Sequence, residues 1–319
     1  MKQTQAVPKL AYRLFLFATL FTWPLLFVGG LVTTYRVGMA VPDWPTTFGI
    51  NMFLYNFLNA AWGVFIEHGH RLYGAAVGFC LLIVVPWVQC LKSVPGTYKR
   101  CAWLALAGVI FQGVLGGYRV RLNSTQLAMF HGSFAQFFFL FLCCMTAWAG
   151  ETRMQLSEST SLNLTSSSLK WFSLALVPLA YLQVVMGGWL RHFQSLQPLY
   201  IHEILGITVV VAITVFCVRV KQTDLMKQKS LRRFRVVLVS LAHLQWLFGF
   251  GAWWLLRPFD GVAKPVTDIQ AFVRTFHQAN GALVLGLTGV MALWVVTAYM
   301  AVGDSAELKI TSREAVCLS

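Results

Sequence analysis

The chain has 319 residues, of which 57% are hydrophobic and only 11% are charged, and its mean hydropathy is +0.65. A soluble domain has about a quarter charged residues, so the composition argues against a water-soluble fold and indicates a membrane protein. The net charge of +14 could suggest nucleic acid as a partner. No basic helix or aromatic platform supports nucleic-acid binding, however, and basic cytoplasmic loops explain the charge more simply.

Four apolar runs in the first half of the sequence are long enough to cross a bilayer. They cover about residues 14–33, 62–88, 102–120 and 126–149. A signal peptide is the competing interpretation of the first run, but the run exceeds a usual signal-peptide core and shows no clear cleavage site. The loop between the first two runs contains VPDWP at residues 41–45, whose prolines exclude a continuous helix there.

A polar Ser/Thr-rich linker at about residues 151–168 divides the chain almost in half. Four further apolar runs follow it, at about residues 171–190, 199–220, 236–256 and 273–300, and a polar tail closes the chain. We therefore predict an all-α polytopic membrane protein with eight transmembrane helices. The helices are expected to form two duplicated four-helix bundles, one in residues 1–150 and one in residues 169–319.

A glycine motif repeats in both halves and supports the predicted duplication. It reads Gln-x-x-x-Gly-Gly at residues 112–117 and 183–188, is looser at 245–251, and is only Gly-Gly at 29–30. From Gln112 to His131 is 19 residues, and from Gln183 to His202 is also 19. Chance rarely preserves such spacings, so we infer an internal duplication. The glycines would let helices approach closely, or let a large flat ligand lie against the backbone.

The loop between the sixth and seventh runs holds the densest cluster of basic residues. These are Arg219, Lys221, Lys227, Lys229, Arg232, Arg233 and Arg235. The positive-inside rule then predicts a multi-pass protein of the cell (inner) membrane with this loop and both termini in the cytoplasm. The bias is incomplete, because the predicted outer loops also carry arginines, namely Arg119, Arg121, Arg191, Arg257 and Arg274.

Four histidines stand at equivalent outer positions of the even-numbered runs: His70, His131, His202 and His277. If each half closes into a bundle, His70 faces His131 and His202 faces His277. Two facing neutral imidazoles suit axial ligation of a heme iron. Zinc or copper stays possible, but few further ligands lie nearby, and the abundant Phe and Trp suit a porphyrin better. Three histidines lack the repeat position and are expected to be structural: His68, His192 and His243.

A carboxylate distinguishes the first half from the second. Glu67 lies three residues before His70, so both occupy one face of a helix, a turn apart. Such a group could act as a base or stabilise positive charge at a heme edge; the alternative is an ion pair with Arg71 or Arg119. Outer arginines could neutralise heme propionates. We expect Arg71 to lie at the first heme site and Arg274 at the second.

The seven cysteines include no CxxC pair, and each lies inside an apolar run or near the predicted cytoplasmic side. We therefore expect neither structural disulfides nor a thiolate metal cluster. No cysteine lies in residues 35–61 or 257–272, the predicted outer loops.

With these features the sequence resembles the heme A synthase family, membrane enzymes that convert heme O to heme A for cytochrome oxidase. The resemblance covers nearly the whole chain, and its motifs are DWP at residues 43–45, EHGHR at 67–71, MFH at 129–131, RH at 191–192, His202 and FHQ at 276–278. A branch of this family carries a cysteine pair in its outer loops, which this chain lacks.

The resemblance implies that His70 and His131 bind the substrate heme O, and that His202 and His277 hold a heme b. It implies that Glu67 is the catalytic carboxylate. The C8 methyl group of the heme would be oxidised twice, to an alcohol and then to a gem-diol that loses water and leaves the formyl group of heme A. It further implies a heme O synthase and cytochrome oxidase assembly factors as partners.

Two other functional classes fit parts of the pattern. A quinone-linked diheme b-type electron carrier would use the same four histidines, but it needs no acid beside one heme only. A heme exporter would need a passage reaching the cytoplasmic helix ends, where no phased ligands occur. Glu67 is therefore the residue that separates the predicted enzyme from an electron carrier.

Overall fold

The computed structural model describes the whole chain except residues 1–6, 159–161, 163, 165–166, 256–265 and 318–319. Eight helices of the described chain are long and apolar enough to cross a membrane. They are α1 (Lys9–Thr34), α2 (Trp62–Cys90), α3 (Gly96–Arg121), α4 (Thr125–Ala149), α6 (Ser168–Phe193), α7 (Leu196–Lys221), α8 (Lys229–Leu255) and α9 (Asp268–Cys317). The predicted all-α polytopic membrane protein is confirmed. Which side of the membrane each end faces stays a prediction.

The helices extend beyond the apolar runs that predicted them. An apolar run marks the part of a helix in hydrocarbon, whereas the terminal turns lie in the polar interface and tolerate charged residues. Thus α8 begins at Lys229, seven residues before the predicted start at 236. The polar tail that follows residue 300 continues α9 as a helix to Cys317.

The predicted linker is partly helical. Residues Glu151–Glu158 form a short polar helix, α5. This segment contains no Gly or Pro, and its Leu156 is fully buried in the apolar core of the second half. Helix α5 packs against α9, so tertiary packing stabilises a helix that is too short to be stable alone.

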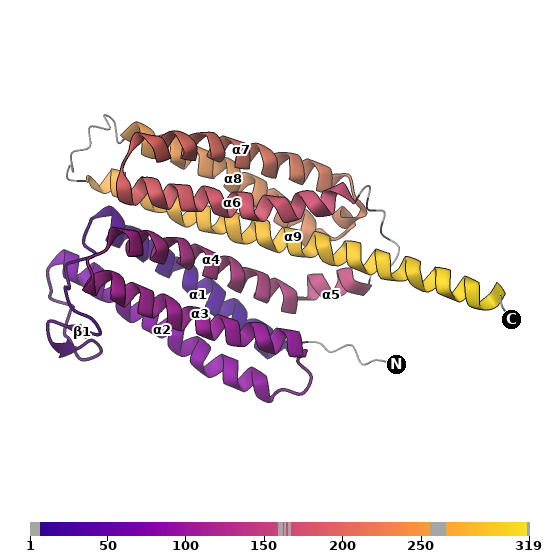
Figure 1. The fold of residues 1–319 in the computed structure, drawn as a ribbon, viewed down its shortest axis with the longest axis horizontal. Helices are drawn as coiled ribbons and strands as arrows, with labels where there is room; N and C mark the ends of the chain where they lie inside the picture. The colour runs from indigo at the N-terminus through magenta and orange to yellow at the C-terminus, as the bar shows by residue number, and fades with distance from the viewer. Residues whose placement is uncertain (1–6, 159–161, 163, 165–166, 256–265, 318–319) are drawn as a thin grey trace.

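The transmembrane helices form two bundles of four. In the first bundle α1 contacts α2, α2 contacts α3, α3 contacts α4 and α4 closes on α1; the second bundle, α6 to α9, repeats this order of contacts. Each bundle has its own apolar core. Figure 1 shows the bundles side by side, the first in indigo to magenta and the second in red to yellow. This arrangement agrees with the predicted duplication, which stays an inference from the sequence repeat.

Two equivalent hydrogen bonds join the bundles. Trp23 of α1 donates its Nε1–H to the backbone carbonyl oxygen of Ala279 in α9 at 2.9 Å. Tyr181 of α6 donates its hydroxyl hydrogen to the backbone carbonyl oxygen of Ser133 in α4 at 3.3 Å. Each donor lies six residues before the Gly-Gly pair of its own helix. Each acceptor lies two residues after a predicted heme-ligand histidine of the other bundle. The interface therefore relates the two halves in a nearly twofold manner.

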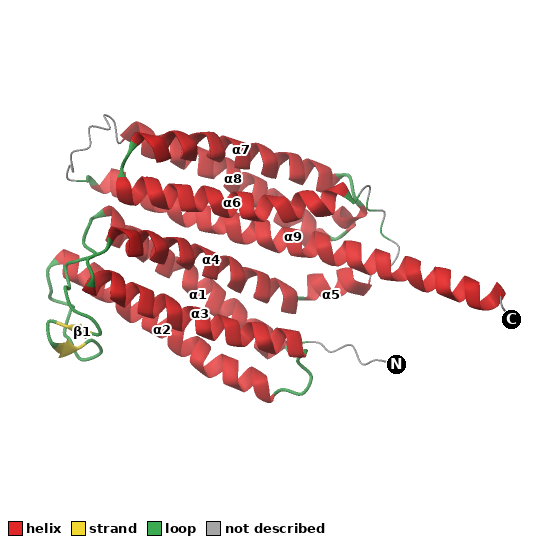
Figure 2. Ribbon diagram, in the orientation of Figure 1, coloured by secondary structure: helices red, strands yellow, loops and turns green. Residues whose placement is uncertain are grey.

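The segment between α1 and α2, residues 35–61, is folded and lies at one end of the first bundle. It contains a small antiparallel hairpin of β1 (Thr46–Thr47) and β2 (Ile50–Asn51), drawn in yellow in Figure 2. The carboxylate of Asp43 accepts hydrogen bonds from the Thr46 hydroxyl and from the two backbone amides of residues 48 and 49, at 2.5–2.9 Å. Burial alone would raise the pKa of Asp43, but these hydrogen bonds hold it below its ordinary value.

Candidate functional site

The structure brings the four repeated histidines together in the predicted pairs. The ring centres of His70 on α2 and His131 on α4 are 6.4 Å apart, and those of His202 on α7 and His277 on α9 are 6.0 Å apart. The rings of each pair are nearly perpendicular, at 84° and 83°. Each bundle therefore contains one facing pair of imidazoles.

Each histidine ring lies against a glycine of the preceding helix. A Cβ at Gly116, Gly187 or Gly249 would come closer than 3.0 Å to the ring, which real Cβ atoms essentially never do, and a Cβ at Gly29 would lie at 3.0 Å, where the ring must give way by a few tenths of an ångström. The four contacts are His70 on Gly29 of α1 (3.0 Å), His131 on Gly116 of α3 (2.8 Å), His202 on Gly187 of α6 (2.7 Å) and His277 on Gly249 of α8 (2.9 Å). Only glycine can occupy these positions without moving the ring, which explains the repeated motif.

Three of the histidines also contact a glutamine one turn before that glycine. The amide Nε2 of Gln112 donates to the backbone carbonyl of His131 at 3.1 Å, and that of Gln183 donates to the carbonyl of His202 at 2.9 Å. The amide nitrogen of Gln245 lies 3.1 Å from Nδ1 of His277. Sequence analysis identified these glutamines as part of a repeat but not as partners of the histidines. The equal spacing of 19 residues in the pairs Gln112–His131 and Gln183–His202 was the available signal; Gln245 and His277 are 32 residues apart.

One large cavity of about 1590 Å³ connects the two sites. All four histidines line it, together with Glu67. Its wall also includes Phe79, Leu82 and Ile110, whose side chains are exposed on the outside of the first bundle. The cavity therefore extends from both histidine pairs to the lipid-facing surface between α2 and α3.

Glu67 is buried in the cavity wall and its carboxylate is fully engaged. Only 2% of the Glu67 side chain is exposed, and its Oε1 forms an ion pair with Arg71 at 2.8 Å. The backbone amide of Val41 donates to Glu67 Oε2 at 2.8 Å. Of the two ion pairs considered for Glu67, the structure therefore contains the one with Arg71.

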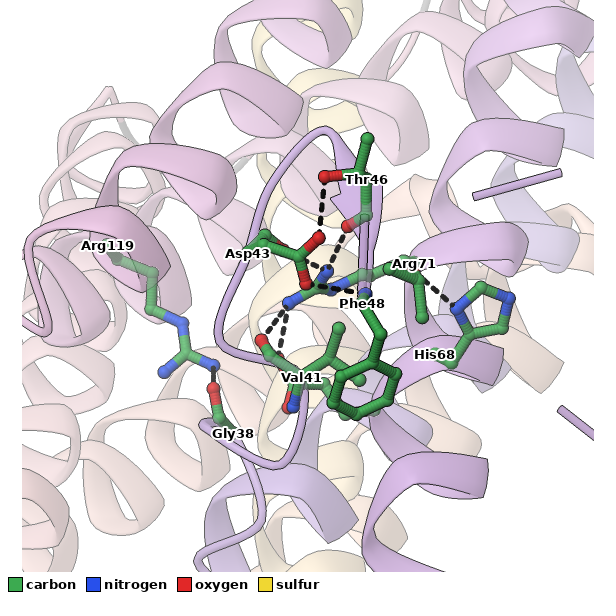
Figure 3. Close-up of polar contacts among 10 residues, drawn as sticks. Gly38, Val41, Asp43, Thr46, Phe48, His68, Arg71 and Arg119 are labelled. Carbon is green, nitrogen blue, oxygen red and sulfur yellow. Dashed lines mark hydrogen bonds and ion pairs between the residues drawn. The ribbon is translucent and has the colours of Figure 1, made fainter. Parts of the chain in front are cut away.

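The guanidinium of Arg71 connects Glu67 to the 35–61 segment. Figure 3 shows the contacts of Arg71 with that segment. It donates to the backbone carbonyl oxygens of Val41 and Asp43, both at 2.7 Å, and to that of Thr46 at 3.3 Å. Arg71 lines the cavity as predicted for a residue near the substrate, but its hydrogen bonds hold the segment in place. A role of Arg71 at a heme propionate stays a prediction.

Other arginines line the cavity without a carboxylate partner among the described residues. Arg119 donates to the Gly38 carbonyl oxygen at 2.7 Å, and Arg191 donates to the Gly30 carbonyl oxygen at 2.7 Å and to the Thr34 hydroxyl. Arg274, the arginine predicted for the second site, also lines the cavity. These buried cations provide unpaired positive charge at the end of the cavity nearest the 35–61 segment, where an anionic group would be stabilised.

The other three histidines have different surroundings. His68 is fully buried, with Nδ1 3.0 Å from the Thr47 hydroxyl and its ring against Tyr55 and Phe57, so it fastens the 35–61 segment to α2. Nδ1 of His243 lies 2.8 Å from a carbonyl oxygen of its own helix. His192, in contrast, lines the cavity, a position that its sequence context did not reveal.

The side chains around each histidine pair show whether the pair suits a metal ion bound by protein alone or a heme. Among the described residues no three His, Cys, Asp or Glu side chains are placed to share a metal ion, and the six described cysteines are free. Each site thus offers two imidazoles only. Two imidazoles on opposite sides of one metal, each bound through nitrogen at about 2.0–2.1 Å, have ring centres roughly 6 Å apart. The observed separations fit a heme, whose porphyrin supplies the remaining ligands.

The fold and the site thus define a polytopic membrane protein with two bis-histidine sites in two four-helix bundles. A family model described as cytochrome oxidase assembly protein (COX15-CtaA) matches residues 12–199. The match covers more than half of the chain and includes the first histidine pair, so the chain belongs to this family, the heme A synthase family. The protein is therefore a protein of cytochrome oxidase assembly. No similar protein was found among curated proteins.

Proposed function

We propose that this protein is a heme A synthase, which oxidises the C8 methyl group of heme O to the formyl group of heme A. The observation that carries the proposal is an asymmetry between two otherwise similar sites. Both have facing imidazoles that rest on glycines, but a buried carboxylate, Glu67, lies one turn from a histidine at the first site. At the second site Glu203 directly follows His202 and lines the cavity, but it is only partly buried and does not occupy the equivalent position. At the equivalent positions before the other three histidines stand Ala128, Leu199 and Arg274.

In this proposal the first site binds the substrate. His70 and His131 hold the heme iron, and the cavity receives the porphyrin. The arginines without carboxylate partners neutralise the propionates, because a buried cation is stable only beside an anion or strong acceptors. The exposed lining between α2 and α3 offers a route from the lipid, in which heme O is soluble.

Glu67 is the residue to which we assign the chemistry. Removing electrons from the methyl group develops positive charge at the carbon. A carboxylate held by Arg71 and by the Val41 amide cannot reorient, so it is preorganised to stabilise that charge in a site of low dielectric constant. Each oxidation removes two electrons and two protons, and a water molecule supplies the oxygen: the first gives the alcohol and the second the gem-diol, which loses water to give the formyl group. The removed electrons and protons go to an acceptor outside this chain.

His202 and His277 would hold the resident heme b, with Arg274 near its propionates. A bound heme b supplies reversible one-electron redox chemistry. The protein contributes two fixed imidazoles, the cradles at Gly187 and Gly249, and a cavity that connects this site to the substrate site. The partners implied by this function are a heme O synthase and other cytochrome oxidase assembly factors.

Extraction and mass analysis of the hemes that co-purify with the protein test the proposal. We expect heme B together with heme O or heme A. Heme B alone, even when heme O is produced in the same cells, would instead support the diheme b-type electron carrier. Expression without a heme O source is the matched control, because only heme B should then be recovered.

A further inference from the structure

Three of the four paired histidines contact a glutamine side chain, and the fourth, His70, does not. We call a glutamine whose amide contacts the histidine of the next helix a glutamine clip; the clips are Gln112–His131, Gln183–His202 and Gln245–His277. Each clip lies one turn before the glycine that contacts the same histidine. The glutamine and the glycine therefore lie on the same face of their helix and contact the same histidine. Together they fix the position of the helix that carries the histidine.

The histidine helices of the second bundle provide a slot for the clip. The slot is a glycine four residues after the histidine: a Cβ at Gly206 would lie 2.9 Å from the amide nitrogen of Gln183, and one at Gly281 would lie 3.1 Å from that of Gln245. Any residue larger than glycine at Gly206 or Gly281 would therefore crowd the glutamine side chain. Gln245 is further held by Asn280, which donates to its Oε1 at 2.8 Å.

His70 is the exception. In α1 the position equivalent to the glutamine of a clip, four residues before Gly29, is Leu25, which has no side-chain amide. The slot glycine is present as Gly74, but a Cβ there would meet nothing within 4 Å, so the slot is open. Among the described residues the His70 side chain makes no hydrogen bond. Its buried Nδ1 has no partner, which is also true of His131 and His202, but those two rings each have a glutamine amide near Nε2. Gly74 lines the cavity on α2, the helix whose Phe79 and Leu82 reach the lipid-facing surface.

We propose that His70 is the ligand that releases the substrate iron, and that Leu25 in place of a glutamine makes it releasable. This inference rests on the proposed function. A six-coordinate heme cannot leave until an axial ligand detaches. The amide nitrogens of Gln112 and Gln183 lie 3.3 and 3.4 Å from Nε2 of His131 and His202, and that of Gln245 lies 3.1 Å from Nδ1 of His277. Each of these imidazoles must therefore give up a polar contact to move, whereas His70 has only the glycine contact to lose. His131, His202 and His277 would keep their positions during exchange.

Carbon monoxide binding measures ligand release directly, because it requires an open axial position on ferrous heme. The full chain is purified in detergent, loaded with hemin (iron protoporphyrin IX), reduced and mixed with carbon monoxide. We expect the substrate-site heme to bind carbon monoxide and the C-terminal heme to resist it. Repeating the measurement in His202→Leu, where only the substrate-site heme should remain, assigns the reactive heme.

Two variants exchange the properties of the sites. Leu25→Gln should place an amide in the open slot at Gly74 and slow carbon monoxide binding about tenfold, the scale expected for one added buried hydrogen bond. Gln183→Leu should make the C-terminal heme reactive, and it carries the test if Leu25→Gln fails to accumulate. Gln89→Leu is the matched control: this glutamine of α2 donates to the Lys99 carbonyl oxygen and does not line the cavity, so its loss should leave both rates unchanged.

The outcomes separate the two proposals. A protein that binds hemin only between His202 and His277 overturns the proposed function and the role of His70 with it. Two bound hemes with equal carbon monoxide reactivity, or a Leu25→Gln protein that binds carbon monoxide at the wild-type rate, overturn only the release role of His70. The readout is a ligand-binding rate, so it does not depend on turnover to heme A.

Discussion

The first and second histidine sites hold their rings at nearly equal separations, 6.4 and 6.0 Å, on glycines at repeat-equivalent positions. Their surroundings differ. The first site has a buried Glu67–Arg71 pair, a folded 35–61 segment tied to that pair, and Leu25 where the other helices place glutamine. The second has two glutamine clips and no equivalent carboxylate. Shared residues thus set the ligand geometry, and unshared residues set what each site can do.

The largest expected effect comes from removing a ligand of the second site. Replacing His202 or His277 with Leu should abolish the low-spin heme b signal of the purified protein, because a single imidazole cannot give bis-histidine ligation. Replacing His70 or His131 should leave that signal intact, since these residues belong to the other bundle. Visible absorption spectra measure both. Retention of a full bis-histidine spectrum in both second-site variants would show that the pairing is wrong.

The next largest effect concerns Glu67. Glu67→Gln keeps the size of the side chain but removes its charge, and we expect conversion to heme A to fall roughly 10²–10³-fold, or about 2.7–4 kcal/mol in the barrier. Heme O or its alcohol should accumulate, as measured by extraction and mass analysis. A variant with wild-type conversion would refute the catalytic role.

The structure supplies a control for that experiment. Glu67 also helps to hold the 35–61 segment through Arg71 and Val41, so its loss could act by loosening the segment. Asp43→Ala loosens the same segment without touching Glu67. If Asp43→Ala reduces conversion as strongly as Glu67→Gln, the role of Glu67 is to position the segment.

A smaller effect is expected when a glycine cradle is filled. A Cβ at Gly187 would lie 2.7 Å from the His202 ring, so Gly187→Ala must displace a heme b ligand. Overpacking of this kind typically costs about 1–3 kcal/mol, which should appear as reduced heme b retention during dialysis. Gly113→Ala is the matched control, because a Cβ there meets nothing within 4 Å. Equal heme retention in the two variants would contradict the cradle role.

The smallest effect should be a pH dependence confined to the first site. The pKa of Asp43 is lowered in the folded protein, so its carboxylate stabilises the 35–61 segment above the ordinary carboxyl range, and this contribution is lost as the pH falls through the lowered pKa. Hydrogen exchange of the residue 48 and 49 amides should therefore rise at acidic pH after correction for the intrinsic rate. Asp43→Asn should remove this dependence, and its persistence there would rule out Asp43 as the cause.

Sequence alone was sufficient for the eight spans, because long apolar runs have few other stable structures in a bilayer. It was also sufficient to propose the histidine pairs, since each of the four histidines lies six to nine residues after the start of its helix and therefore at a similar depth. The helix α5 could not be predicted, because it forms in polar sequence and depends on packing against α9. The continuation of α9 could not be predicted either, because it runs through the polar sequence that follows the apolar run.

The tertiary structure decided which groups touch. Only the folded chain shows that Arg71, rather than Arg119, pairs with Glu67, and that both are tied to a segment some 25 residues earlier in the chain. It also shows that the repeated glutamines contact the repeated histidines while the slot beside His70 stays open. Side-chain direction, not spacing, determines these contacts, because several neighbours lie within reach of one helix face and packing selects among them.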